Sequence, residues 1–192
     1  MNTLIDIKIE PISPAMASGL LPDLTGLLMD TVNHGASIGF LAPLELAQAH
    51  AYWLGVLADM EDGATLLWVA RAGEQVVGTV QLQTCPRANG RNRAEVCKLM
   101  VHSRWRGQGI ASLLMAALEG MARKLERGML YLDTEAGSGA EGLYLSLGYT
   151  RVGEIPDYAA SPDGTLHPTA IYYKQLIDRS LVPLAVVAES EA

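Results

Sequence analysis

Two acidic residues lie in stretches of the chain that are otherwise largely apolar and rich in strand-forming residues. Glu95 begins one such stretch, and Asp133 lies near the end of another. If the two stretches are neighbouring strands, both carboxylates face a common cleft, where burial raises the pKa of a carboxyl group. A carboxylate of that kind can take a proton from a reacting group. The alternative is a structural ion pair of either acid with Arg93 or Lys98.

A glycine-containing turn follows the first of these stretches. The strand-like run covers residues 95–101, and a helix-like run begins at Ile110, with apolar residues three and four positions apart. Gly107 and Gly109 let the backbone turn tightly between them. The N–H groups of the first helical turn then point outward, with the positive end of the helix dipole behind them. Such a turn binds phosphate, so the sequence predicts an anion site here.

The glycine spacing discriminates among phosphate-binding motifs. A Walker loop ends in Gly-Lys-Ser or Gly-Lys-Thr, and neither triplet occurs in the chain. A dinucleotide-binding turn needs a third glycine where Ser112 stands and an acid after the next strand, which Asp133 could supply. That interpretation is weakened but stays open, as does a turn with a structural role only. The pattern that fits best is Arg104-x-x-Gly107-x-Gly109.

On this motif the sequence resembles the GNAT family of N-acetyltransferases, and the likeness extends to Ala140, Tyr144 and the pair Gly148-Tyr149. It implies an α/β (α+β) fold, the GNAT fold, with a central mixed sheet of six to seven strands flanked by about four helices. It also implies acetyl-coenzyme A as the cosubstrate. The residues implied to bind it are Met100, Val101, Arg106, Gly107, Gln108, Gly109, Ile110, Ala111, Ser138 and Tyr144. One departure is Gly137, where many members carry Asn.

Acetyl transfer from a thioester to an amine needs a neutral amine, a stabilised oxyanion and a proton for the leaving thiolate. An alkyl amine is mostly protonated at neutral pH, so Glu95 and Asp133 are the candidates to take its proton, directly or through a water. Tyr144 is the candidate proton donor, because the family pattern has a tyrosine there, and its alternative is a packed core aromatic. Backbone N–H groups near Met100 and Val101 would meet the oxyanion if a bulge splays the central strand.

A closer likeness is to the tabtoxin-resistance group of these acetyltransferases, which block an amino acid-like toxin. It covers roughly residues 20–175 and is strongest in the segments 33–40, 132–138 and 161–170. It implies an enzyme that acetylates the amine of a small amino acid-like metabolite or toxin by direct attack in a ternary complex. It also implies that the two carboxylates act together.

Two loops are expected to border the substrate, at residues 33–41 and 156–168. Their candidate binding residues are His34, Ser37, Phe40, Asp163 and His167. The alternatives are plain connectors and ordinary loop hydrogen bonds. Two other functions stay open as well: acetylation of protein or peptide amines, which would need an open groove in place of the loops, and a regulatory module that binds an acyl-coenzyme A without turnover.

The composition fits one globular domain, expected at residues 1–179 with a tail at 180–192. The chain has 192 residues, of which 49% are hydrophobic and 18% charged. Its net charge of −7 argues against a nucleic-acid partner, although nine Arg or Lys against three Glu between Arg87 and Arg127 suit a small polyanion. The four histidines lack metal-ligand spacing, so no metal is expected. A homodimer is an expectation from the family likeness alone.

The chain contains no run of about eighteen apolar residues, and Met1 to Lys8 lack the features of a secretory signal. We therefore expect a cytoplasmic protein, without a membrane partner, in which Cys85 and Cys97 are reduced. A cross-strand disulfide stays open, since the two cysteines lie in adjacent predicted strands. Nucleophilic catalysis by Cys97 is disfavoured because its strand looks buried and no histidine is near it in sequence.

Periodicity and turn residues predict the order of the elements. Strands are expected at 4–10, 65–70, 75–83, 95–101, 129–134, 151–155 and 170–174, and helices at 18–32, 43–62, 110–125 and within 137–149. Pro11 and Pro14 are expected to end the first strand, Pro43 to open the second helix and Gly128 to stop the third. The strand at 129–134 should run parallel to the one at 95–101, because a helix connects them.

Overall fold

The computed structural model describes residues 6–178. Its strands are β1 Ile7–Ile12, β2 Thr65–Ala72, β3 Gln75–Thr84, β4 Arg93–Val101, β5 Met129–Glu135, β6 Thr150–Ala160 and β7 Leu166–Gln175. Its α-helices are α1 Pro14–Gly19, α2 Leu21–Asn33, α3 Leu46–Glu61, α4 Ile110–Lys124 and α5 Gly139–Ser146. Two short 3₁₀ turns lie at Ala88–Gly90 and Ser103–Trp105. The start of the first predicted strand and the predicted tail at 180–192 lie outside the described residues.

All seven strands belong to one mixed sheet, in the order β1-β2-β3-β4-β5-β7-β6. β4 and β5 are parallel, as predicted from the helical connection, and the other neighbouring pairs are antiparallel. The mixed sheet of six to seven strands is thus confirmed. The described residues contain five α-helices where about four were expected, because the first predicted helix is divided in two.

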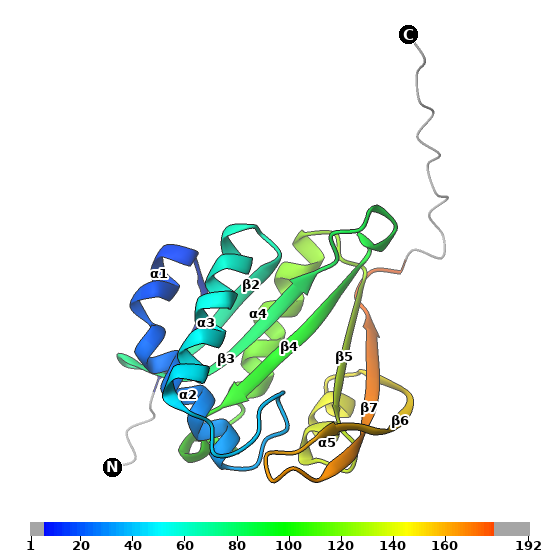
Figure 1. Ribbon diagram of the computed structural model, residues 1–192. Coiled ribbons are helices and arrows are strands. Elements are labelled where there is room, and N and C mark those ends of the chain that lie inside the picture. The colour runs from blue at the N-terminus through cyan, green and yellow to red at the C-terminus, as the bar shows by residue number, and fades with distance from the viewer. Residues whose placement is uncertain (1–5, 179–192) are drawn as a thin grey trace.

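Helices cover both faces of the sheet (Figure 1). α4 lies on one face, where Ile110, Leu114 and Leu118 pack against Val80 and Leu82 of β3. α2 and α3 lie on the other, in a second core that includes Leu28, Trp53 and Met100; α1 packs with them. Because strand side chains alternate between faces, β2, β3 and β4 each contribute to both cores.

β4 and β5 are paired over only three positions, from Arg93 opposite Met129 to Glu95 opposite Tyr131. Beyond these pairs the two strands diverge (Figure 1), while β4 stays paired with β3 and β5 with β7. β4 also contains a bulge. Two successive pairs between β3 and β4 are separated by one residue of β3 but by two residues of β4, and Lys98, one of these two, has a φ of +50°. The bulge lies just before Met100, so the condition set for an oxyanion site near Met100 and Val101 is met, although the sequence does not predict a bulge.

Two predictions at the start of the chain are wrong. Pro11 does not end β1 but lies inside it, which is tolerated because β1 is an edge strand paired only with β2. The helix expected at 18–32 is divided at Leu20, the C-cap of α1. Pro22 has no N–H for the carbonyl of residue 18, and its ring would clash with that carbonyl, so one continuous helix cannot form. Pro14 instead opens α1, whose N-cap Ser13 accepts from Met16 N.

Three further predicted boundaries are wrong. Pro43 does not open α3, which begins at Leu46 after a capping box between Glu45 and Gln48. Gly128 does not stop α4, because the chain already leaves the helix at Leu125 and Glu126. The predicted loop 156–168 is mostly strand: β6 continues to Ala160 and β7 starts at Leu166, so only the turn at 161–165 remains. Edge position and a register shift in β6 accommodate its proline.

A buried ion pair fastens α4 to β7. Lys174 Nζ lies 2.8 and 2.7 Å from the two carboxylate oxygens of Glu119 and donates to Leu147 O at 2.7 Å. Glu119 is buried, and Lys174 also lies over the ring of Tyr149. The pair therefore fixes the helix that begins at the glycine turn.

We expect Glu119→Ala to lower the free energy of unfolding by about 3 kcal/mol, because it leaves the Lys174 ammonium largely buried without its counter-charge. Urea denaturation followed by circular dichroism measures the loss. The double variant Glu119→Leu, Lys174→Met should recover most of it, since an apolar pair of similar volume replaces the charges. A double variant as unstable as the single one would contradict this explanation.

Candidate active site

The glycine turn between β4 and α4 presents a row of backbone donors. Gly107 and Gly109 have φ values of +74° and +78°, a conformation that favours glycine, and Gly109 is the N-cap of α4. The first backbone bond of the helix runs from Leu113 N to Gly109 O at 3.2 Å. Within residues 6–178, the N–H groups of residues 107–112 donate to no backbone or side-chain acceptor.

The charge distribution along α4 favours an anion at this turn. The first turn of the helix contains no acidic residue and no side-chain cap, whereas Arg123 and Lys124 lie in its last turn. The positive end of the helix dipole is therefore uncompensated by the protein. The predicted residues Arg106, Gly107, Gln108, Gly109, Ile110 and Ala111 all lie here, with Ile110 buried in the core and the others at least partly accessible.

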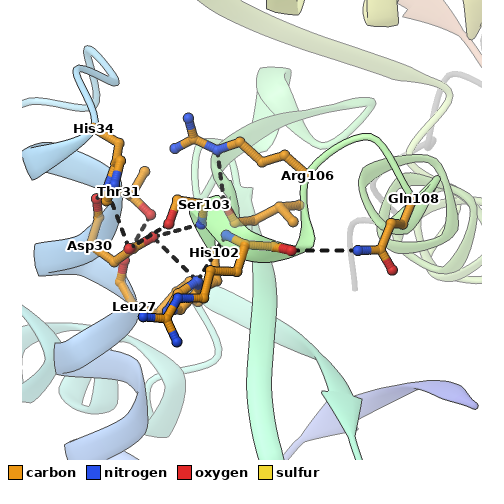
Figure 2. Close-up of polar contacts among 10 residues, drawn as sticks. Leu27, Asp30, Thr31, His34, His102, Ser103, Arg106 and Gln108 are labelled. Atoms are coloured by element: carbon orange, nitrogen blue, oxygen red, sulfur yellow. Dashed lines mark hydrogen bonds and ion pairs between the residues drawn. The ribbon is translucent and has the colours of Figure 1, made fainter. Parts of the chain in front are cut away.

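Two side chains of the turn bond back to the segment before it. Arg106 Nε donates to Val101 O at 3.2 Å, and Gln108 Nε2 lies 3.5 Å from Arg104 O. Figure 2 shows the two side chains on opposite sides of the turn. A hollow of about 350 Å³ beside them is lined by Gln75, His102, Arg104, Trp105 and Gln108.

Asp30 of α2 holds the residues just before the turn (Figure 2). Ser103 donates to its carboxylate through N at 2.7 Å and through Oγ at 2.8 Å. His34 and His102 place Nδ1 within 3.3 and 3.6 Å of the same carboxylate. Burial acts to raise the pKa of Asp30, but the two bonds from Ser103 and the histidines outweigh it, so that this pKa lies below its ordinary value. Sequence reasoning missed Asp30, which is 73 positions from Ser103.

Glu95 and Asp133 lie on the same face of the sheet as α2 and α3. Their neighbours Ala94 and Leu132 belong to the core beneath α4, so the acids point the opposite way. We call this side of β4 and β5 the acid face. Tyr131 OH donates to Glu95 Oε2 at 3.0 Å, and a threonine of β7 donates to Asp133 Oδ2, also at 3.0 Å.

Neither acid is paired as the structural alternative required. In the described part of the chain, no ion pair joins Glu95 or Asp133 to Arg93, Lys98 or another cation. The expected burial, however, is found only in part. Glu95 is half-buried and Asp133 is exposed, because β5 has no strand beside it on the β4 side beyond Tyr131.

Tyr144 belongs to α5 and is 7% exposed, with its ring edge-on to Tyr149 at 5.8 Å. Burial, and then the charges of Asp133 and Cys97, raise the pKa of Tyr144 to about 12. The tyrosine is thus a packed core aromatic whose hydroxyl lies within electrostatic range of both strands. Among the described residues, none forms a hydrogen bond with that hydroxyl.

The two cysteines are free thiols, as expected. They are not opposite each other, because Cys97 pairs with Gln81 while Cys85 follows the end of β3. Burial, followed by the charge of Glu95, raises the pKa of Cys97 to about 12. A thiol with that pKa stays protonated at neutral pH and is a poor nucleophile.

Ser138 is the N-cap of α5, and its Oγ lies 3.5 Å from Thr134 Oγ1. Gly137 before it has a φ of +80° and donates to Glu141 Oε1 at 2.6 Å. Glycine and asparagine are the residues that best tolerate a positive φ, so the backbone conformation at this position is compatible with either.

The two predicted substrate loops are joined directly. Ala42 N of the segment 34–45 donates to Pro162 O of the turn 161–165 at 2.8 Å, and Figure 1 shows these segments together at one end of the sheet. Phe40 packs edge-on against Tyr52 of α3 at 5.3 Å. The loop and the hairpin turn therefore meet at one end of the sheet.

The remaining predicted substrate residues are spread around these loops. Ser37 and His167 are half-buried, whereas Asp163 is exposed and accepts from Thr165 N at 2.9 Å, which lowers the pKa of Asp163. That bond is of the ordinary loop kind. Within residues 6–178, the ring of His34 has no hydrogen bond to either loop, and its Nδ1 lies 2.7 Å from Asp30 O. The role of these residues in binding a substrate stays a prediction.

Other features lie away from this region. An apolar hollow of about 270 Å³ at the end of α4, lined in part by Leu66, Met121 and Leu125, contains none of the predicted site residues. Among residues 6–178, no group of three His, Cys, Asp or Glu side chains is arranged to hold a metal ion. The helices of that range are too short or too polar to cross a membrane.

Comparison with known proteins gives a consistent picture. The model of the acetyltransferase (GNAT) family matches residues 36–149. N-acetyltransferase 8B of Rattus norvegicus is 37% identical over 97 residues, which are 50% of this chain and 44% of the relative. N-acetylaspartate synthetase of Danio rerio is 34% identical over 115 residues, 59% of this chain and 38% of the relative. The matched part thus spans less than half the length of these curated relatives.

The fold is also that of solved acetyltransferase structures. An acetyltransferase of Salmonella typhimurium, solved with acetyl-CoA, superposes with a TM-score of 0.72 at 19% identity. The superposition covers 93% of this chain and 98% of that chain. At this identity the likeness establishes the fold, and it agrees with the seven-stranded mixed sheet described above.

We expect Asp30→Asn to destabilise the protein at neutral pH and not in acid. The lowered pKa of Asp30 means that its carboxylate contributes stability above the unfolded-state value of about 3.9. This contribution is lost as the pH falls through the lower pKa of the folded state. Urea denaturation at pH 7, 5 and 3 should therefore show a difference between wild type and variant that shrinks with acidity.

The matched control is Asp6→Asn, since Asp6 is exposed and belongs to no hydrogen-bonded network in the described residues. It should leave the stability unchanged at each pH. A difference between wild type and Asp30→Asn that stays constant from pH 7 to pH 3 would contradict the electrostatic explanation.

Proposed function

The chain belongs to the acetyltransferase (GNAT) family, and on this premise we propose that it transfers the acetyl group of acetyl-coenzyme A to the amine of a small amino acid-like metabolite or toxin. The observation that carries the proposal is the divergence of β4 from β5, with the glycine turn after β4 and Glu95 and Asp133 on the diverging strands. When bound, acetyl-coenzyme A supplies an activated acyl group.

The glycine turn has the donors that a pyrophosphate needs. The N–H groups of residues 107–112 have no acceptor within the described chain, and the dipole of α4 adds positive potential. Arg106 and Gln108 flank this row of amides. Met100 and Val101 follow the bulge on the strand edge that β5 leaves unpaired, so their backbone groups can bind the pantetheine amides and the oxyanion.

Glu95 and Asp133 would take the proton from the incoming amine, directly or through a water. Tyr131 and Thr169 each donate one hydrogen bond to these carboxylates and so orient them. Because an alkyl ammonium has a pKa near 10, a carboxylate beside it attracts the cation and takes its proton, which frees the nitrogen lone pair to attack the acetyl carbon. Two acids on neighbouring strands can share this work.

Tyr144 would donate a hydrogen bond to the leaving sulfur. With a pKa of about 12 its hydroxyl keeps its proton at physiological pH. A thiol has a pKa of about 8.5, so complete transfer from this phenol would be uphill. Tyr144 therefore stabilises the thiolate by a hydrogen bond. One of the two protons that the ammonium loses, passed on through the carboxylates and water, then protonates the sulfur.

Direct attack is favoured over an acyl-enzyme. The Cys97 thiol is held protonated by burial and by the same carboxylates that serve the amine. A covalent route through this residue would first need the thiolate, which the acids oppose. A ternary complex of cosubstrate and amine needs no such step.

A small acceptor is favoured over a protein or peptide. The bond between Ala42 and Pro162 joins the loops at the end of the acid face where a peptide would need an open groove. The zebrafish relative is named for N-acetylaspartate, an acetylated amino acid, which supports the same substrate class. A tabtoxin-like toxin is one candidate within that class, and a non-catalytic acyl-coenzyme A-binding module is the alternative outside it.

We expect Glu95→Gln to lower kcat by about 100-fold, the scale of a lost general base, with a smaller loss for Tyr144→Phe. The measurement is thiol release from acetyl-coenzyme A, with and without a panel of small amines. Glu61→Gln, an exposed acid on α3, is the matched control. Binding of acetyl-coenzyme A without thiol release from any amine would leave only the non-catalytic alternative, whereas full activity in Glu95→Gln would remove its assigned role alone.

We expect Gly109→Ala to weaken the binding of coenzyme A by about tenfold, since a side chain at φ +78° costs roughly 1–2 kcal/mol and distorts the amide row. Isothermal titration calorimetry measures the affinity. Gly120→Ala, in the middle of the same helix with open space around the added Cβ, is the control and should bind normally while gaining stability. Equal affinities for both variants would refute the role of the turn.

A further inference from the structure

Lys98 is a cation whose direction the bulge in β4 determines. Cys97 lies on the acid face, opposite Gln81, so in a regular strand the next side chain would point to the α4 side. Instead Lys98 Nζ lies 5.8 Å from the ring centroid of Tyr52 in α3. It is also near Gly39, because a Cβ built there would be 3.5 Å from it. The extra residue of the bulge has turned this lysine onto the acid face.

The conformation of Lys98 is unfavourable for its residue type. Its φ of +50° is one of three positive values at residues other than glycine in the described chain, and the other two lie outside β4. A lysine has no local side-chain interaction that favours this region, as Asn or Asp has. Strained backbone of this kind gathers at functional sites, and here it coincides with the divergence of β4 from β5.

Lys98 has no anionic partner in residues 6–178. None of the ion pairs of that range includes it, and Tyr52 is kept protonated because burial raises the pKa of its hydroxyl. Lys98 as a whole is half-buried, and its ammonium lies over an aromatic ring, which provides a weak attraction without neutralising the charge. A partly desolvated cation gains most from an anion that arrives with a ligand.

The charges on the acid face are separated by sign. Glu95 is bonded to Tyr131 of β5, and Asp133 lies further along that strand, whereas Lys98 leans away from β5 towards α3. All three also act on the thiol of Cys97, whose pKa is raised first by burial and then by the acids, and lowered by the lysine. A molecule with an ammonium at one end and a carboxylate at the other matches this arrangement.

We propose that Lys98 binds the carboxylate of the acceptor, so that the substrate is an amino acid or a compound with a free amino acid carboxylate. This inference rests on the proposed function and narrows it. The acids at β4 and β5 receive the amine, and Lys98 holds the opposite end of the same molecule. It acts on binding and selectivity, and it takes no part in proton transfer.

The test is steady-state kinetics at saturating acetyl-coenzyme A with the common L-amino acids, each compared with its primary amide. The amide keeps the amine and removes the carboxylate charge. We expect wild type to prefer the acid by about tenfold or more in KM, the size of one charged hydrogen bond. Lys98→Met should raise KM for the acid by about tenfold and leave the amide, kcat and KM for acetyl-coenzyme A unchanged.

Two further variants separate charge from folding. Lys98→Gly accepts the positive φ without strain, so it should lose the same selectivity with no loss of thermal stability. Lys124→Met, an exposed lysine at the end of α4, should behave as wild type. Equal losses for acid and amide in Lys98→Met, or a preference of wild type for amines that carry no carboxylate, overturn the proposal while the acetyltransferase activity stands.

A binding measurement covers the case in which no amine releases thiol and the proposed function fails. The same amino acids, in radiolabelled form, are then tested for binding to the coenzyme A-bound protein by equilibrium dialysis. Weaker binding to Lys98→Met than to wild type supports the carboxylate site. Equal binding by both proteins, or binding by neither, overturns it.

Discussion

The separation of β4 from β5 in the middle of the sheet is the constraint on which the other features depend. Two parallel strands at the centre of a sheet normally stay paired, because each unpaired N–H or C=O group that is shielded from water is unfavourable. Here pairing ends after three positions, yet β3 and β7 hold the outer edges of the two strands. The sheet therefore remains one body while the facing edges of β4 and β5 keep backbone groups available to a ligand.

This separation allows side chains from opposite faces of the sheet to take part in the proposed reaction. Glu95 and Asp133 belong to the face of α2 and α3, whereas Tyr144 belongs to α5 and packs in the core of the α4 face. An intact sheet would keep the tyrosine hydroxyl from the acids. Because the strands diverge, Asp133 and Cys97 both contribute to the electrostatics of Tyr144. In the proposed reaction, the acyl donor lies in the opening between β4 and β5, and therefore between the two faces of the sheet.

The glycine turn depends on contacts made far away in sequence. Its donors are exposed because Gly107 and Gly109 adopt positive φ values, which the glycine pattern predicted correctly. The segment before the turn is held by Asp30, on a helix formed much earlier in the chain, and no local pattern indicates that pairing. The bulge is similar, since an extra residue in a strand leaves no periodic signal and Lys98 is an ordinary residue for an exposed strand position. The strand boundaries predicted from prolines were wrong, because edge strands and bulges accept a proline that strand propensity alone would exclude.

The same electrostatics that serves an amine makes a covalent route unfavourable. Burial raises the pKa of the Cys97 thiol, and the carboxylates that would attract an ammonium raise it further, so little of this thiol is thiolate at neutral pH. Lys98 opposes this effect on the thiol, yet the pKa of Cys97 remains at about 12. A single lysine among two acids therefore does not activate the thiol. In the proposed reaction its charge is matched to an anion of the acceptor, and two acids with one cation on the same face favour direct attack by a dipolar amine on the thioester.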